Sequence, residues 1–139
     1  MENRNFEIHS EWLQCRADTQ QLFEFLSNIQ NLESILPKDK VNSIQSTNNT
    51  LSFQIENIIT LTLFIHQLKP FSSDNHQANI EYLSKPFGNY HLRLNVHFNN
   101  NQSQIVLSGY LNPFVLSIAK KKLIHLINRI NQELSVFKP

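Results

Sequence analysis

The segment Asn89–Phe98, with the sequence NYHLRLNVHF, alternates between apolar and polar side chains along its whole length. In an extended strand these two sets point to opposite faces, which places Tyr90, Leu92, Leu94, Val96 and Phe98 against His91, Arg93, Asn95 and His97. Antiparallel sheets with one dry face and one solvated face have this pattern. The segment therefore predicts a sheet whose dry face packs against another element.

The element that covers the dry face is predicted at the end of the chain. Asn112 and Pro113 are typical of a helix start, because Asn caps the first turn and Pro at the first helical position loses no hydrogen bond. The helix is expected to reach about Val136, with an apolar stripe formed by Leu116, Leu123, Ile127, Ile130 and Leu134 and broadened by Ala119, Leu126 and Phe137. We expect this stripe to lie on the sheet.

The remaining segments give the order of elements. Period-two alternation and turn residues predict further strands at 6–14, 41–46, 51–56, 59–69, 77–83 and 104–111. The apolar residues of the first are Phe6, Ile8 and Trp12. Between the first two, Asp18 with Gln21 is typical of a helix N-terminus, and a second short helix ends before Pro37. The predicted fold is α+β: a seven-stranded curved antiparallel sheet wrapped around the long C-terminal helix, with two short helices after the first strand. We expect residues 1–139 to form this single helix-grip domain.

Composition limits the possible partners. The chain has 139 residues, 17% of them charged, and a formal net charge of +1. Nucleic-acid partners are not expected, because a surface that tracks phosphates has a marked basic excess. The basic run Lys120–Lys122 is interpreted as a solvated helix face. Cys15 is the only cysteine, which excludes an intrachain disulfide and a cysteine zinc site.

The apolar stretches of the chain indicate where in the cell the protein is expected. The N-terminal residues from Met1 to Ile8 contain no apolar signal region, and the longest nearly apolar stretch, 58–65, is too short to cross a bilayer. We expect a cytoplasmic protein without integral membrane association.

Three stretches of the chain look like a known superfamily. They are Cys15–Asn28 (CRADTQQLFEFLSN), Asn31–Pro37 (NLESILP) and Leu111–Phe114 (LNPF). Together with the order of elements, they resemble the START-like, Bet v 1-like superfamily, whose bacterial members are often called SRPBCC or polyketide cyclase/dehydrase proteins. The likeness runs from Phe6 to Leu134 and rests on structural positions. It implies a helix-grip fold with a cavity between the sheet and the last helix, often for lipids, polyketides or other apolar molecules, and it implies no particular reaction.

A ligand cavity would be lined by inward-facing strand residues and by the terminal helix. The candidates are Phe53, Ile55, Leu61, Leu63, Ile65, Ile80, Tyr82, Tyr90, Leu92, Leu94, Val96, Leu107, Gly109, Leu116, Leu123 and Ile127. The alternative is that these residues form a packed core. Gly109 either leaves space in the cavity or marks a bulge in its strand. Tyr82 and Tyr90 are the candidate polar groups of the wall, unless their hydroxyls simply reach water.

Catalytic and metal-binding residues are not predicted. His91 and His97 share one strand face but lie about 20 Å apart, too far to hold one ion. The carboxylates fall on outward faces or surface helices, and Glu56 would face inward only after a register slip of one residue. Cys15 has no evident His partner. We therefore expect no catalytic residue, no metal and no cofactor.

Three functions remain open on these grounds. The leading hypothesis is non-enzymatic binding of a small hydrophobic, lipid-like or aromatic ligand. The first alternative is a polyketide cyclase- or dehydratase-like enzyme that uses Tyr82 or Tyr90 beside a carboxylate. The second is a protein-interaction domain, with Phe64 and Leu68 on an otherwise polar face as its support. The chain is expected to be a monomer or a weak homodimer.

Overall fold

The structure is a computed structural model that describes residues 4–85 and 90–139; Asn89, where one predicted strand begins, lies outside them. The elements in chain order are β1 (Phe6–His9), β2 (Leu13–Gln14), α1 (Thr19–Leu26), the 3-10 helix η1 (Ile29–Ile35), β3 (Val41–Ser46), β4 (Leu51–Ile55), β5 (Ile59–Lys69), β6 (Gln77–Ser84), β7 (His91–Asn99), β8 (Gln102–Tyr110) and α2 (Pro113–Val136).

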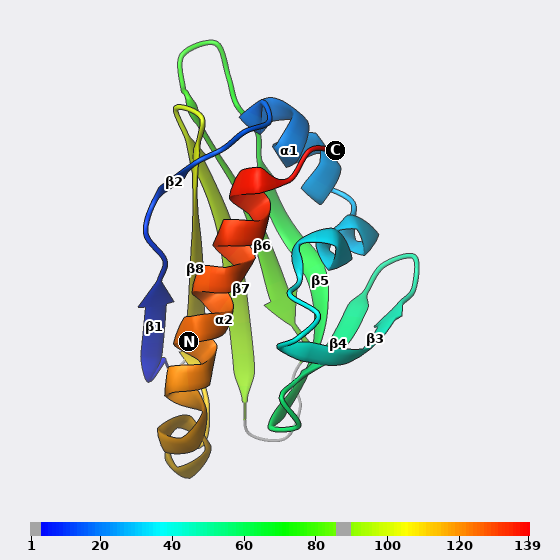
Figure 1. The fold of residues 1–139 in the computed structure, drawn as a ribbon, viewed down its shortest axis with the longest axis vertical. Coiled ribbons are helices and arrows are strands. Elements are labelled where there is room, and N and C mark those ends of the chain that lie inside the picture. The colour runs from blue at the N-terminus through cyan, green and yellow to red at the C-terminus, as the bar shows by residue number, and fades with distance from the viewer. Residues whose placement is uncertain (1–3, 86–89) are drawn as a thin grey trace.

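The strands form one antiparallel sheet that holds the long helix α2 on one face (Figure 1). The order along the sheet is β1-β8-β7-β6-β5-β4-β3, and β2 also pairs with β8. Helix α2 packs against β8, β1, β2 and η1, whereas α1 contacts β6 and η1 contacts β4 and β5. The predicted helix-grip α+β fold is confirmed. Among the described residues, no helix is long and apolar enough to cross a membrane.

The sheet has eight described strands where seven were predicted. The predicted strand 6–14 is divided into β1 and β2, which both pair with β8. Ser10 lies at the break, where its hydroxyl accepts the Ile105 amide at 2.8 Å and its own amide donates to the Ile105 carbonyl at 2.9 Å. Trp12, expected as an apolar residue of a continuous strand, is instead 40% exposed.

The register of the sheet confirms the predicted dry face. Leu92 pairs with Gly109, Leu94 with Leu107 and Val96 with Ile105, so the inward residues of β7 and β8 lie side by side. Their row continues into β6, where Ile80 pairs with Val96 and Tyr82 with Leu94. The inner face is therefore continuous across the sheet.

One prediction about the outer face is wrong. A register shift lies between Ile65 and Gln67 in β5. Beyond it Leu68 pairs with the buried Ile80, so Leu68 belongs to the inner face and not to the polar face where the alternation placed it. A bulge of one residue exchanges the two faces for the rest of the strand. Leu68 is nevertheless 43% exposed.

The helix caps follow the predicted chemistry. The Asp18 carboxylate accepts the Gln20 amide at 3.0 Å at the start of α1, and the Asn112 side-chain oxygen accepts the Phe114 amide at 2.8 Å at the start of α2. Pro113 occupies the first turn of α2, as expected. The second short helix forms as a 3-10 helix, also capped by an Asn side chain.

A buried amide fixes α2 to the sheet. The side-chain nitrogen of Asn131 donates to the carbonyls of Glu11 at 2.7 Å and Ser103 at 3.1 Å, and its oxygen accepts the Ser103 hydroxyl at 2.7 Å. Asn131 is fully buried. Because water cannot reach this amide, its hydrogen bonds to the protein take the place of hydrogen bonds to water.

Candidate functional site

The interior between the sheet and α2 contains the residues predicted to line a cavity. Ile65, Tyr90 and Leu116 are half-buried, and the other thirteen are buried: Phe53, Ile55, Leu61, Leu63, Ile80, Tyr82, Leu92, Leu94, Val96, Leu107, Gly109, Leu123 and Ile127. The fifteen residues other than the glycine all belong to or pack against one hydrophobic core. The structure thus brings the predicted residues together as a dry interior.

The two candidate tyrosines donate their hydroxyls to the main chain. Tyr82 donates to the Leu26 carbonyl at 2.6 Å, which ties β6 to the end of α1, and burial raises the pKa of Tyr82. Tyr90 donates to the Thr60 carbonyl at 2.6 Å, and burial also raises the pKa of Tyr90. Both phenols are therefore neutral at physiological pH, and both hydroxyls bond to the main chain.

Charged side chains are absent from the described inner positions of the central strands. These positions hold Leu51, Phe53, Ile55, Ile59, Leu61, Leu63, Ile65, Leu68, Ala78, Ile80, Tyr82, Ser84, Leu92, Leu94, Val96, Phe98, Ser103, Ile105, Leu107 and Gly109. The serines bond within the protein: Ser84 accepts the Leu92 amide at 2.7 Å, and Ser103 bonds to Asn131. A molecule in contact with this face would meet almost only carbon atoms.

The close approach of β7 and β8 accounts for Gly109. Its φ of +148° lies outside the range that side chains favour, and a Cβ atom there would lie 2.3 Å from the His91 carbonyl oxygen. The backbone of β8 therefore requires glycine at this position, independently of any ligand.

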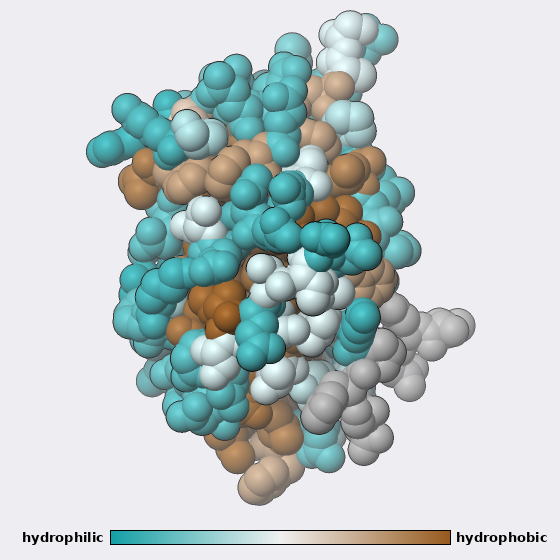
Figure 2. Space-filling view, turned by 90° about the vertical axis from the view of Figure 1, so that its right-hand side faces the viewer, coloured by the Kyte–Doolittle hydropathy of each residue, from teal (hydrophilic) through white to brown (hydrophobic). Residues whose placement is uncertain are grey.

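Apolar side chains gather where α2 begins. Phe114 is 74% exposed and Ile118 is 51% exposed, while Val115 and Leu116 are half-buried. Figure 2 shows apolar atoms at the lower end of the molecule, where Figure 1 places the first turns of α2. Leu116 lies on the predicted sheet-facing stripe but is less covered than Leu123, so this end is the less enclosed side of the interior.

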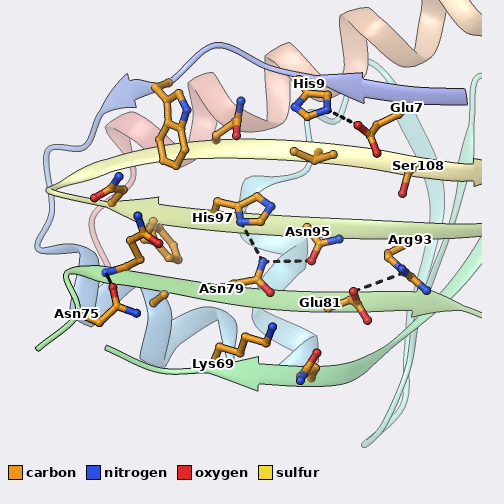
Figure 3. Close-up of a pocket in the computed structure, with 18 of the residues that line it drawn as sticks. Glu7, His9, Lys69, Asn75, Asn79, Glu81, Arg93, Asn95, His97 and Ser108 are labelled. Atoms are coloured by element: carbon orange, nitrogen blue, oxygen red, sulfur yellow. Dashed lines mark hydrogen bonds and ion pairs between the residues drawn. The ribbon is translucent and has the colours of Figure 1, made fainter. Parts of the chain in front are cut away.

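A second site lies on the opposite, outer face of the sheet and was not predicted. It is a hollow of about 570 Å³, which falls in the size range of small-molecule sites. Strands β1, β5, β6, β7 and β8 supply most of its wall, and Figure 3 shows their side chains standing on this face. The register explains the grouping, because Lys69 pairs with Asn79 and Asn79 with His97 across three strands.

Amides and a histidine bond to one another in the middle of the hollow. The Asn79 side-chain nitrogen lies 3.1 Å from the Asn95 side-chain oxygen and 3.3 Å from Nδ1 of His97 (Figure 3). Partial burial lowers the pKa of His97, and the nearby His9 and Lys69 lower it further. A neutral His97 accepts from Asn79 at Nδ1 and carries its proton on Nε2.

Acidic groups of the hollow are paired with basic ones. Glu7 accepts from Arg4 at 3.1 Å and lies 2.7 Å from His9, whose hydrogen bond is the main reason that the pKa of Glu7 is lowered. Glu81 lies 2.7 Å from His66 and 3.5 Å from Arg93. The wall therefore combines charges of both signs with neutral amides.

The half-buried imidazole of His97 predicts a pH dependence of stability. Because the folded pKa of His97 lies below the unfolded value of 6.5, the unfolded chain binds the proton more readily. The neutral imidazole therefore makes its full contribution to the free energy of unfolding above pH 6.5, and this contribution declines as the pH falls below that value. When the pH is lowered from 7.5 to 5, we expect the parent protein to lose more unfolding free energy than His97→Gln. Urea unfolding at each pH measures this difference.

The exposed His125 on α2 provides the control for this measurement, and His97→Gln is expected to change the pH dependence more than His125→Gln. An unchanged pH dependence in His97→Gln would contradict the burial of this imidazole.

A metal centre is not found in the part of the chain that the structure describes, where no three His, Cys, Asp or Glu side chains are grouped to hold an ion. Cys15 is buried, which raises the pKa of its thiol.

Comparison with known proteins supports the fold. No protein-family model and no curated protein sequence matches the chain. Among solved structures, the chain is similar to the protein TTHA0849 from Thermus thermophilus, with a TM-score of 0.53, 10% identity and coverage of 93% of this chain and 94% of that one.

Two further structures resemble the chain over almost their full length. An uncharacterised protein from Bacillus thuringiensis gives a TM-score of 0.51 at 13% identity, covering 93% of this chain and 98% of the other. The Aha1 dimer from Colwellia psychrerythraea gives 0.50 at 13% identity, covering 97% and 100%. At such identities the likeness establishes the shared fold, and the chain is a helix-grip protein.

Proposed function

We propose that this chain is a non-enzymatic binding module of the START-like superfamily that takes up a small hydrophobic molecule, lipid-like or aromatic, between the sheet and α2. The observation that carries the proposal is the uncharged inner face. A ligand there is held by apolar burial, at about 25 cal/mol per Å² removed from water, with Tyr82 and Tyr90 as the candidate polar groups of the wall.

Uptake requires the interior to open, and the packing of α2 indicates where this occurs. Asn131 anchors the second half of the helix to β8 and to the segment between β1 and β2. The first turns carry exposed Phe114 and half-buried Leu116 instead. We propose that the ligand passes beside Leu116, where displacing α2 costs the fewest buried contacts.

The proposal predicts ligand-dependent stabilisation. A molecule that binds only the folded state raises the free energy of unfolding by about 2.7 kcal/mol at one hundred times its Kd. We expect at least one member of a panel of fatty acids, polyketides and aromatic compounds to raise the melting temperature of the protein in a saturable way, measured by scanning calorimetry.

A matched pair of variants on one helical turn tests the route. Leu116→Trp adds bulk at the half-buried position, and we expect it to weaken binding roughly tenfold, or about 1.4 kcal/mol less stabilisation. Ser117→Trp places the same side chain at the exposed neighbour and is expected to bind like the parent. If the ligand raised the melting temperature equally in the parent, Leu116→Trp and Ser117→Trp, the proposed route would be contradicted. If no compound of the panel raised the melting temperature of the parent, the proposed function would be contradicted.

We further propose that the module is cytoplasmic and acts as a monomer or a weak homodimer. The balanced net charge of +1 and the free Cys15 fit this setting. The Aha1 structure is described as a dimer, but this concerns that protein.

A further inference from the structure

We propose that the hollow on the outer face of the sheet is a second binding site, for a neutral, hydroxyl-rich ligand such as a mono- or disaccharide. The site lies on the face opposite α2, so this proposal stands independently of the hydrophobic ligand. It rests on three properties of the wall: its amides, its charge balance and its apolar positions.

Amide side chains are the most numerous kind in the wall. They come from β5, β6, β7, β8 and the segment before β6, and they are Gln67, Asn75, Gln77, Asn79, Asn95, Asn99 and Gln104. An amide carries both donors and an acceptor, and so does each sugar hydroxyl, which means that neighbouring hydroxyls can bond to one amide in both directions. The neutral imidazole of His97 adds the Nε2 proton as a further donor beside them.

The charges of the wall disfavour a strongly ionic ligand. Glu7 is engaged by Arg4 and His9, and Glu81 by His66 and Arg93. An anion would have to compete with these carboxylates for Arg4 and Arg93, although Lys69 in the same wall lies outside these pairs. A cation would have to compete with the basic groups for both carboxylates. A neutral polar ligand avoids both costs and still accepts hydrogen bonds from the wall.

Apolar positions complete the match. Trp12, at 40% exposure, and Val106 both line the hollow. A sugar ring presents C–H groups on its faces, which can lie against an indole whose π system has a negative face. An exposed Trp can therefore contact the C–H face of a pyranose ring while the amides bond to the hydroxyls at its edge. The size of the hollow, about 570 Å³, leaves space for such a ligand.

The only tryptophan of the chain reports directly on this site. Because Trp12 is the single indole, its fluorescence isolates events at the hollow. We expect saturable emission changes when the full-length protein is titrated with at least one of glucose, galactose, N-acetylglucosamine, maltose and cellobiose. Sodium phosphate and sodium acetate at equal ionic strength are expected to give none. A response to these anions with no response to any sugar would overturn the proposed ligand class.

Variants test whether side chains of the hollow bind the sugar or only form a solvated face of the sheet. Asn79→Ala is expected to weaken sugar binding roughly tenfold, since it removes the central amide of the hollow. Gln45→Ala removes an exposed amide from β3, outside the hollow, and is expected to bind like the parent. Trp12→Ala is expected to bind the sugar at least tenfold more weakly, measured by saturation-transfer NMR on the sugar protons. This variant replaces Asn79→Ala as the test if Asn79→Ala fails to fold. Parent-like affinity in Trp12→Ala, or the lack of saturation with every sugar, would overturn the proposal.

Discussion

Alanine in place of Gly109 is expected to destabilise the protein by about 3 kcal/mol, which is a large effect for the smallest possible side-chain addition. A Cβ atom at this position would lie 2.3 Å from the His91 carbonyl oxygen and 2.9 Å from the Leu92 Cα atom. Both atoms belong to the backbone of β7, so no side chain can turn away to make room. The strands must move apart, which weakens the pairing of β7 with β8, and the φ of +148° adds strain.

The measurement for Gly109→Ala is urea unfolding followed by circular dichroism. Gln102→Ala, at the other end of β8, provides the control and is expected to stay within about 0.5 kcal/mol of the parent. If Gly109→Ala were as stable as this control, the close approach of β7 and β8 would be incorrect.

The second large effect is expected for Asn131→Ala, at about 3–5 kcal/mol. The substitution removes three hydrogen bonds from a fully buried site and leaves the carbonyls of Glu11 and Ser103 without this donor. It also leaves a cavity beneath α2. Because these bonds join the helix to β8 and to the segment before β2, their loss should loosen the terminal helix as a unit.

Hydrogen exchange distinguishes this mechanism from a general loss of stability. In Asn131→Ala, amides of α2 are expected to lose protection before those of β6 and β7. Gln132→Ala, the exposed neighbour on the helix, is expected to match the parent in both stability and exchange. Uniform loss of protection across the sheet and the helix would contradict the role of Asn131 as the anchor of α2.

The sequence was sufficient for the fold because its period-two and helical patterns are strong. Every second residue from Leu92 to Phe98 is apolar and buried, and one bulge-free register carries this face into β8. Asn112 and Pro113 marked the start of α2 correctly, since a cap is a local property of a few residues. The buried positions of the predicted wall follow from the same periodicity.

Local breaks in pairing could not be predicted in this way. The shift after Ile65 reverses the faces of β5. The two consecutive polar residues His66 and Gln67 fit an extra residue there, but they fit a polar strand end equally well. The break at Ser10 depends on hydrogen bonds to Ile105, which is distant in the sequence. The sequence alone allows Gly109 to leave cavity space or to mark a bulge, whereas its role depends on how closely β7 lies to it.

The outer hollow was missed for a related reason. Its residues are ordinary polar positions of separate strands, and only the order β1-β8-β7-β6-β5 brings them together. The sequence did contain one signal, an isolated Trp12 in a polar context, which the alternation assigned to the apolar side of a continuous strand. Polar faces of sheets therefore require the pairing register before their sites can be found.

Native mass spectrometry of the intact protein, before and after incubation with the hydrophobic panel, tests the central proposal most directly. The uncharged interior predicts a discrete, stoichiometric complex with a small apolar molecule, which dissociates when the protein is unfolded and forms less readily in Leu116→Trp than in Ser117→Trp. Protein that stays ligand-free after purification and after exposure to every member of the panel would contradict the proposed binding of a hydrophobic molecule between the sheet and α2.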